Sequence, residues 1–348
     1  MALPTGHLFA NRYEVTRYID SGTYGDVYEA IDTHQDDRVV ALKLLNPAKL
    51  GSWPWQEATM LTRLDSEYVL SIFNADVDAG IPYLATQLAT SGSLEGAGHL
   101  PRLSVREVVA IVRGAARGLA RTHDGGIVHR DVKPANLFWS ATSSAMVGDF
   151  GFAHPLDANG EAPPEGTPVT AAPELLTGGP ATVQSDIWSL GATAYQLLTG
   201  VYPHEDLAAS RTRQDLYPAR TGRPPTPLRD LAPHISQRLA SRIERALAEM
   251  PCDRYPSMTS FESDLGAGAT PARSWRENQP HPGHLRCWTS DDPSDLTVCM
   301  ASGTTAALAN IDVRHAVSGN RIVKHCSDDG YLRAAGGRLR SIFEKLGN

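Results

Sequence analysis

The sequence is poor in cysteine and has no long run of apolar residues. Its 348 residues include only four cysteines, and no two form a C-x-x-C pair, which excludes a disulfide scaffold and indicates reduced thiols. The first twelve residues lack the charged and apolar regions of a signal peptide. The most apolar stretch, residues 105–120, is interrupted by three arginines, so no membrane span is expected. Together these absences predict a cytoplasmic protein.

The charge is acidic and the composition is that of a folded protein. The net charge is −7, the acidic excess lies in residues 1–265, and 41% of the residues are hydrophobic. A chain of this length and composition is expected to form about two domains with apolar cores. Phosphate contacts require clustered cations, which the acidic body lacks, so no nucleic-acid partner is expected.

Apolar periodicity divides the chain into a strand-rich beginning and a helical remainder. Period-two patterns predict strands at 13–19, 26–30, 38–45, 69–73 and 83–88. Period-3.6 patterns predict helices at 55–64, 104–123, 182–199, 236–249 and 257–264. The helix at 104–123 begins with a capping box of Ser104 and Glu107. A small antiparallel sheet followed by a helical region is therefore expected.

A glycine-bearing turn lies between the first two predicted strands, in the segment Ser21-Gly22-Thr23-Tyr24-Gly25-Asp26-Val27. Alone, this segment is equally consistent with an ordinary hairpin turn that uses the positive φ of glycine. The chain continues as a strand after the glycines, whereas a dinucleotide fingerprint or a Walker loop leads into a helix. The remaining functional interpretation is a hairpin lid whose backbone N–H groups cover the phosphates of ATP.

A lysine follows in the third predicted strand, at the end of Val40-Ala41-Leu42-Lys43. An unpaired ammonium in an apolar strand would be costly, and Glu57 in the next predicted helix is its natural counter-ion. The segment matches the V-A-I-K strand of protein kinases, in which the lysine and its glutamate hold the α- and β-phosphates.

Three further motifs follow at fixed spacing. Residues 129–136 read H-R-D-V-K-P-A-N, Asp149-Phe150-Gly151 begins thirteen residues after Asn136, and residues 166–174 end in A-P-E. With the glycine turn and Lys43, these motifs resemble those of the eukaryotic-like serine/threonine protein kinases of bacteria. The resemblance covers about residues 11–265. It implies an α+β, bilobal fold, with a small antiparallel-sheet N-lobe at about 11–88 and a helical C-lobe at about 89–265.

The resemblance also implies the catalytic and metal-binding residues. Asp131 would accept or orient the proton of a substrate hydroxyl, and Lys133 would neutralise the transferred phosphoryl group. Thr167 would bond both of these side chains. Asn136 and Asp149 would hold Mg²⁺, or Mn²⁺ as a substitute, through oxygen atoms. The catalytic set implied is Asp131, Lys133, Asn136, Lys43 and Thr167, and the metal set is Asn136 and Asp149.

The same alignment places the ATP site. Asp20 stands where the family has the first glycine of its loop, and an acid there repels phosphates unless it points outward. Thr86 would be the gatekeeper, and Phe138 would lie beneath the adenine, where an aliphatic residue is more usual. The implied nucleotide-binding residues are Ile19, Asp20, Ser21, Gly22, Thr23, Tyr24, Gly25, Val27, Ala41, Lys43, Glu57, Thr86, Gln87, Ala89 and Phe138.

The segment before Thr167 bears on regulation. In the family, a phosphate on this segment commonly pairs with the arginine before the catalytic aspartate, here Arg130. Residues 152–166 contain no Ser, Thr or Tyr, but they do contain Asp157, Glu161 and Glu165. Two interpretations are open. In the first, one of these carboxylates is a permanent ion-pair partner of Arg130. In the second, Arg130 bonds only backbone and the carboxylates are solvated.

The C-terminal residues carry no motif of a known family. A linker is expected at 266–282 and a small α+β module at 283–348, with strands at 285–290, 296–300, 309–313 and 320–323. A closing helix at 338–346 is expected to pack on the module's own sheet rather than on a membrane or a partner. A module this small is marginal alone, so docking on the kinase or on a partner is expected.

The cysteines and histidines of the module allow two interpretations. His281, His284 and Cys287, together with Cys299 or Cys326, could bind zinc. Without a C-x-x-C pair, however, strand cysteines are usually small buried hydrophobes.

Three functions can be compared with these motifs: an active protein kinase, a pseudokinase and a small-molecule kinase. An active kinase that transfers the γ-phosphoryl of MgATP to Ser or Thr of protein substrates explains every motif. A pseudokinase would have lost Lys43, Asp131, Asn136 or Asp149, and all four are present. A small-molecule kinase normally lacks the A-P-E segment and its arginine, here Glu174 and Arg254. The sequence thus predicts a serine/threonine protein kinase and leaves its substrate and oligomeric state open.

Overall fold

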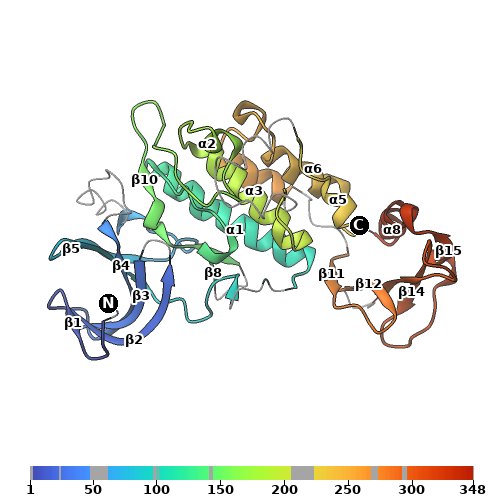
Figure 1. Cartoon of the computed structure of the whole chain (residues 1–348), viewed down its shortest axis with the longest axis horizontal. Helices are drawn as coiled ribbons and strands as arrows, with labels where there is room; N and C mark the ends of the chain where they lie inside the picture. The colour runs from blue at the N-terminus through green and yellow to red at the C-terminus, as the bar shows by residue number, and fades with distance from the viewer. Residues whose placement is uncertain are drawn as a thin grey trace.

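The fold has three parts that follow one another along the chain (Figure 1). The computed structural model describes residues 3–22, 25–47, 62–96, 100, 102–140, 144–204, 223–267, 273–291 and 296–347. An antiparallel sheet forms the N-terminal part, helices form the middle, and a second sheet with one helix forms the C-terminal end. The predicted fold class, a bilobal α+β fold with an added α+β module, is confirmed.

Six strands form the N-terminal sheet, in the order β1-β2-β3-β4-β6-β5. Their bounds are Leu8–Phe9 (β1), Tyr13–Gly22 (β2), Gly25–Asp32 (β3), Arg38–Leu45 (β4), Ile72–Asp78 (β5) and Ile81–Gln87 (β6). Alternate residues such as Tyr13, Tyr28 and Leu42 form a buried cluster on one face. All five predicted strands are present, although the one expected at 69–73 begins at Ile72. The helix expected at 55–64 lies outside the described residues.

Two long helices, α1 (Val105–Asp124) and α3 (Val183–Thr199), organise the middle part. The predicted capping box starts α1: the Glu107 N–H donates to Ser104 Oγ at 3.3 Å, and the Ser104 N–H donates to the Glu107 carboxylate at 2.7 Å. Shorter helices are α2 (Pro173–Leu176), α5 (Leu228–Leu231), α6 (Gln237–Ala246) and α7 (Met258–Gly266). Short strands are β7 (Ile127–Val128), β8 (Leu137–Trp139), β9 (Ala145–Val147) and β10 (His154–Pro155). In the described part of the chain, no helix combines the length and apolar character that a bilayer crossing requires.

Two glycines on one side of α1 allow backbone to approach it closely. A Cβ at Gly118 would lie 2.2 Å from the carbonyl oxygen of Tyr68, and a Cβ at Gly114 would lie 2.8 Å from the carbonyl oxygen of Ala145. Both distances are too short for any side chain, so glycine is required by space rather than by φ at these positions. The helix thereby contacts β9, the strand that leads directly to Asp149.

Five antiparallel strands and one helix form the C-terminal module. The strands are β11 (Trp275–Asn278), β12 (His284–Ser290), β13 (Leu296–Ser302), β14 (Leu308–His315) and β15 (Ser327–Tyr331), in that spatial order, and the helix is α8 (Ala335–Lys345). The α8 residues Leu339, Ile342 and Phe343 are buried in one cluster with Trp275 and Trp288 of the sheet. The predicted packing of this helix on the module's own sheet is confirmed.

Two predictions for this module are wrong. The expected linker at 266–282 contains β11, which pairs with β12, so the module's sheet starts at Trp275 rather than after residue 282. Within 320–323, Arg321 forms an isolated bridge with Arg314 and Val323 begins a 3-10 helix (Val323–His325), and the last strand is β15 instead. The apolar residue that suggested the strand, Val323, is 71% exposed, whereas β15 is a polar edge strand without apolar alternation.

The C-terminal module docks on the start of α1. Ser104 forms a β-bridge with Arg276, the Arg106 N–H donates to Ser274 Oγ at 2.9 Å, and Arg276 pairs with Glu107 at 3.0 Å. The residues that cap α1 therefore also hold the first strand of the module. The sequence left two docking partners open for the module, the kinase-like part of the chain or a separate protein. In the structure the module docks on the kinase-like part of the same chain.

A second contact region lies after α5. His234 is buried against Trp288 and Phe343, with ring centroids 6.2 and 6.0 Å apart. Burial, with a smaller contribution from the charge of Arg286, lowers the pKa of His234 to about 3, so the imidazole is neutral at physiological pH. An ion pair of 2.7 Å between Arg229 and Glu344 lies at the same interface.

Candidate active site

The polar side chains of the loop between β7 and β8 converge on Asp131, which is buried. Its Oδ1 accepts hydrogen bonds from the hydroxyl and the backbone N–H of Thr167, at 2.6 and 3.1 Å. Its Oδ2 accepts from Asn136 Nδ2 at 2.8 Å and pairs with Lys133 Nζ at 2.8 Å. Lys133 Nζ also donates to the Thr167 hydroxyl at 2.8 Å. The structure thus gathers four of the five predicted catalytic residues into one hydrogen-bonded cluster.

The backbone of this loop is held by Asp186, at the start of α3. Its carboxylate accepts from the N–H groups of His129 and Arg130 at 2.8 and 2.9 Å, and His123 Nε2 lies 2.8 Å from it. Burial alone would raise the pKa of Asp186, but the hydrogen bond with His123 and the neighbouring imidazoles lower it below its ordinary value. The ionised carboxylate stabilises Arg130 in its left-handed conformation, with φ of 68°.

Lys43 of β4 and Asp149 form a direct ion pair between Nζ and Oδ1. Burial would raise the pKa of Asp149, but the charge and hydrogen bond of Lys43 outweigh this effect, so the pKa is lowered and the carboxylate is ionised. Phe150, the next residue, is buried against the His129 ring at a centroid distance of 5.0 Å. The expected counter-ion of Lys43, Glu57, lies outside the described residues.

The residues predicted to hold Mg²⁺ lie on adjoining segments. The Gly148 N–H, next to Asp149, donates to the backbone carbonyl of Asn136 at 3.0 Å. The side-chain Nδ2 of Asn136 is used by Asp131, which leaves its amide oxygen as the atom that could bind a cation. An ionised carboxylate and an amide oxygen are ligands that a hard divalent cation prefers. The donor set therefore fits magnesium.

The predicted nucleotide-binding residues that the structure describes lie along β2, β3, β4, β6 and β8, except Ala89, which follows β6 by two residues. Thr23 and Tyr24 lie outside the described residues, and Gly22 and Gly25 pair at the end of the β2–β3 hairpin. Ile19, Asp20 and Ser21 are exposed, and Val27, Ala41, Lys43, Thr86, Gln87, Ala89 and Phe138 are half-buried. Asp20 accepts a hydrogen bond from the Ser21 N–H at 2.8 Å, so its carboxylate bonds the backbone of its own strand.

A buried ion pair between Arg254 and Glu174 holds the end of the A-P-E segment. Arg254 donates to both oxygens of Glu174, at 2.7 and 2.8 Å, and also to the carbonyl oxygens of Gln184, Ala248 and Glu249 at 2.8 to 3.0 Å. The Arg254 side chain is fully buried and the Glu174 side chain is 18% exposed. This pair anchors the A-P-E segment to the helical part, as the sequence predicts.

A family model described as "Protein kinase domain" matches residues 13–264. The chain belongs to the protein kinase family. Over 329 residues the chain is 30% identical to the serine/threonine-protein kinase PknA of Mycobacterium tuberculosis, and this match covers 89% of the chain and 71% of PknA. It is 33% identical to Pkn1 of Myxococcus xanthus over 272 residues, covering 73% of the chain and 38% of Pkn1. It is 28% identical to the probable kinase PknB of Corynebacterium glutamicum over 323 residues, covering 87% of the chain and 48% of PknB.

The matched relatives are mostly longer than this kinase. The chain spans between 38% and 71% of the length of the curated relatives it matches. All of these relatives are named serine/threonine-protein kinases.

Arg130, in the predicted catalytic loop at 129–136, holds the segment that precedes Thr167. Arg130 donates from Nε to the carbonyl of Phe152 at 2.5 Å and from Nη1 to the carbonyl of Pro163 at 2.7 Å. Asp157 accepts from the N–H groups of Asn159 and Glu161, at 2.8 and 3.0 Å, and these bonds lower the pKa of its carboxyl group. The Asp157 carboxylate therefore stabilises its own turn, and two backbone carbonyls of the segment accept hydrogen bonds from Arg130.

Two residues of the site are ones that the sequence did not single out. His123, the penultimate residue of α1, shares Asp186 with the catalytic loop. Gly148 leaves room for Phe138, since a Cβ at Gly148 would lie 2.7 Å from that ring, and its carbonyl accepts from His129 Nε2 at 3.0 Å. No motif marks His123. Gly148 stands directly before the Asp149 motif, and this position is a signal that could have identified it as part of the site.

Proposed function

We propose that this chain transfers the γ-phosphoryl group of MgATP to serine or threonine hydroxyls of protein substrates. The observation that carries the proposal is the Asp131 cluster, in which a buried carboxylate is bonded by Thr167, Lys133 and Asn136 together. A pseudokinase has no need of this complete set. Four free cysteines, with the need for ATP, favour the cytoplasm as the place of action.

Each residue then has a role that its contacts support. Asp131 would orient the substrate hydroxyl and take its proton, and Lys133 would stabilise charge on the transferred group. Thr167, bonded to both, would position them, which is the arrangement that the family resemblance associates with Ser/Thr rather than Tyr substrates. Asn136 and Asp149 would hold magnesium, which neutralises phosphate charge when bound.

The substrate class is favoured by the Glu174–Arg254 pair. Kinases of small molecules normally lack the A-P-E segment and its arginine, and here both are present and bonded through two oxygens. The segment between Gly166 and Glu174 is therefore anchored at its end, which suits docking of an extended polypeptide beside Asp131. We infer a protein substrate rather than a small molecule.

The direct test is transfer of label from γ-labelled ATP to the chain itself and to a generic basic protein. Labelled phosphoserine or phosphothreonine is expected, with no phosphotyrosine, and Lys43→Met is expected to abolish labelling because it removes the partner of Asp149 and of the phosphates. Absence of protein labelling by the wild-type chain, or equal labelling by Lys43→Met, would contradict the proposal.

We also propose that this kinase is active without phosphate upstream of Thr167. Residues 152–166 hold no Ser, Thr or Tyr, and backbone bonds to Arg130 already order the segment. Pro155, Pro163 and Pro164 reduce the entropy lost on ordering it. Enzyme treated with phosphatase, or never exposed to ATP, is therefore expected to phosphorylate a generic substrate without a lag.

The measurement is the time course of substrate labelling at several enzyme concentrations. A linear course from the first time point at each concentration supports the proposal. A lag that shortens as enzyme concentration rises would instead show activation by one molecule of another, with Thr167 or Thr170 as the sites to examine.

A further inference from the structure

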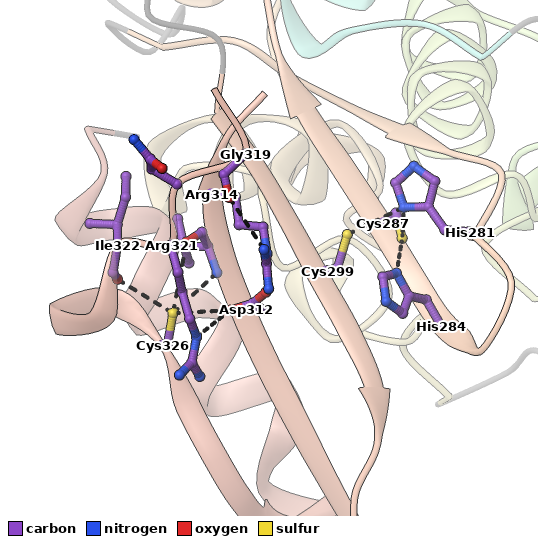
Figure 2. Close-up of polar contacts among 12 residues, drawn as sticks. His281, His284, Cys287, Cys299, Asp312, Arg314, Gly319, Arg321, Ile322 and Cys326 are labelled. Carbon is purple, nitrogen blue, oxygen red and sulfur yellow. Dashed lines mark hydrogen bonds and ion pairs between the residues drawn. The ribbon is translucent and has the colours of Figure 1, made fainter. Parts of the chain in front are cut away.

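Four metal-ligating side chains meet on one face of the C-terminal sheet, far from the proposed active site (Figure 2). They are His281 from the β11–β12 turn, His284 and Cys287 from β12, and Cys299 from β13. Their nearest ligand atoms all lie within 4.8 Å of one another. His281 Nδ1 lies 3.3 Å from Cys287 Sγ and 3.5 Å from Cys299 Sγ, and His284 Nδ1 lies 3.3 Å from Cys287 Sγ.

These distances match those between the ligands of one tetrahedral ion. With Zn–S of about 2.3 Å and Zn–N of about 2.0–2.1 Å, tetrahedral angles place a nitrogen and a sulfur about 3.6 Å apart. The three nitrogen–sulfur distances observed are 3.3, 3.3 and 3.5 Å. Two imidazoles and two thiols are also the donor set that favours zinc over the harder cations.

Local backbone explains why these four residues meet. Cys287 and Cys299 are opposite each other in the β12–β13 register, so their side chains share a face. Gly283, with φ of 82°, allows the tight turn before β12, and the His284 N–H donates to the His281 carbonyl at 2.9 Å across it. The two sulfurs are buried while His281 is exposed, so an ion could enter from the solvent side.

The structure also decides which cysteine completes the set. Cys326 lies on the other side of Asp312 and Arg314 from the four residues (Figure 2). Its thiol contacts Asp312 Oδ1 and the Ile322 carbonyl, both at 3.4 Å. Cys326 therefore belongs to a separate polar group, and Cys299 is the fourth ligand.

We propose that His281, His284, Cys287 and Cys299 bind one Zn²⁺ in a closed structural site. Binding would release the two thiol protons to solvent, leaving two thiolates and two neutral imidazoles around the ion, a centre without net charge. All four tetrahedral positions would be filled by protein, so the site holds structure and does not activate water.

The place of the site in the module indicates what the ion stabilises. It ties the β11–β12 turn to β12 and β13 in a module that is too small to rely on its apolar core alone. Arg286, the residue before Cys287, donates to the Leu231 carbonyl of the kinase part at 2.6 Å. Zinc would therefore fix the strand that makes this docking contact.

The experiment measures the metal content of the full-length chain, produced with zinc in the medium and freed of any affinity tag. About one zinc per chain is expected for the wild type, near none for Cys287→Ser and Cys299→Ser, and wild-type content for the matched control Cys326→Ser. Metal-free wild type titrated with Co²⁺ is expected to show the visible bands of a tetrahedral ion with thiolate ligands. This second readout does not depend on whether the variants fold.

Three results would overturn the proposal. The first is wild-type chain without zinc and without a tetrahedral cobalt spectrum. The second is a loss of zinc in Cys326→Ser as large as in Cys287→Ser. The third is a disulfide between Cys287 and Cys299 in the freshly purified chain, found by mass spectrometry without reduction, since the facing cysteines could form one.

Discussion

Replacement of Asp131 by asparagine is expected to lower kcat by about 10²–10⁴-fold, the range for loss of a general base. That loss corresponds to about 3–5 kcal/mol of transition-state stabilisation. The amide has nearly the shape of the carboxylate and can still accept from Thr167, but it cannot take a proton and does not balance the charge of Lys133. ATP affinity is expected to stay unchanged, because no predicted ATP contact involves Asp131.

The measurements are initial rates with labelled ATP and titration with a fluorescent nucleotide. Asp36→Asn is the matched control, since Asp36 is exposed in the turn between β3 and β4 and its replacement changes the same chemical group. A kcat for Asp131→Asn within a few-fold of the control would show that Asp131 is not the base. A parallel loss of nucleotide affinity would show that the variant disturbs the whole site.

The second large effect is expected on stability. Arg254→Leu should cost about 3–5 kcal/mol of unfolding free energy, the range for removing one partner of a buried ion pair. The loss leaves the Glu174 carboxylate without its cation and three backbone carbonyls without the Arg254 donor. Urea unfolding followed by circular dichroism measures the change.

Two variants sharpen this test. Arg17→Leu removes one partner of an exposed ion pair with Glu29, and such pairs contribute about 0–1 kcal/mol. The double variant Glu174→Leu/Arg254→Leu removes both buried charges and is expected to recover part of the lost stability. A cost for Arg254→Leu no larger than that of Arg17→Leu would refute the structural role assigned to the buried pair.

The sequence predicts the kinase part well because its signals are local and reinforce one another. The strand at Arg38–Leu45 and the helix at Val105–Asp124 follow from unbroken periodicity and, for the helix, from a capping box. The predicted catalytic residues lie at fixed spacing on short segments, so the loop that carries Asp131 and the turn that carries Asp149 come together once the fold forms. The roles of these residues remain predictions that the variants above test.

The C-terminal module is predicted less well because its organisation depends on register. Spacing alone cannot show whether Cys299 or Cys326 joins Cys287, since that choice follows from which residues of β12, β13 and β14 lie opposite one another. Strands β11 and β15 are short and polar, so neither produces an apolar alternation. The contacts of Asp157 likewise depend on the shape of its loop. Proline and glycine determine that shape, and they leave no periodic pattern in the sequence from which it could be predicted.

The glycines of α1 have a consequence for the position of Asp149, a residue proposed to hold magnesium. Gly114 lets α1 approach the Ala145 carbonyl of β9, and Gly118 lets it approach the Tyr68 carbonyl, which accepts from the Val147 N–H of the same strand. Main-chain atoms therefore set the distance between the helix and the strand before Asp149. A change of side-chain size elsewhere in the apolar core is therefore expected to leave that strand in place against the helix. The position of the Asp149 carboxylate relative to the loop at 129–136 therefore depends on backbone contacts more than on the size of core side chains.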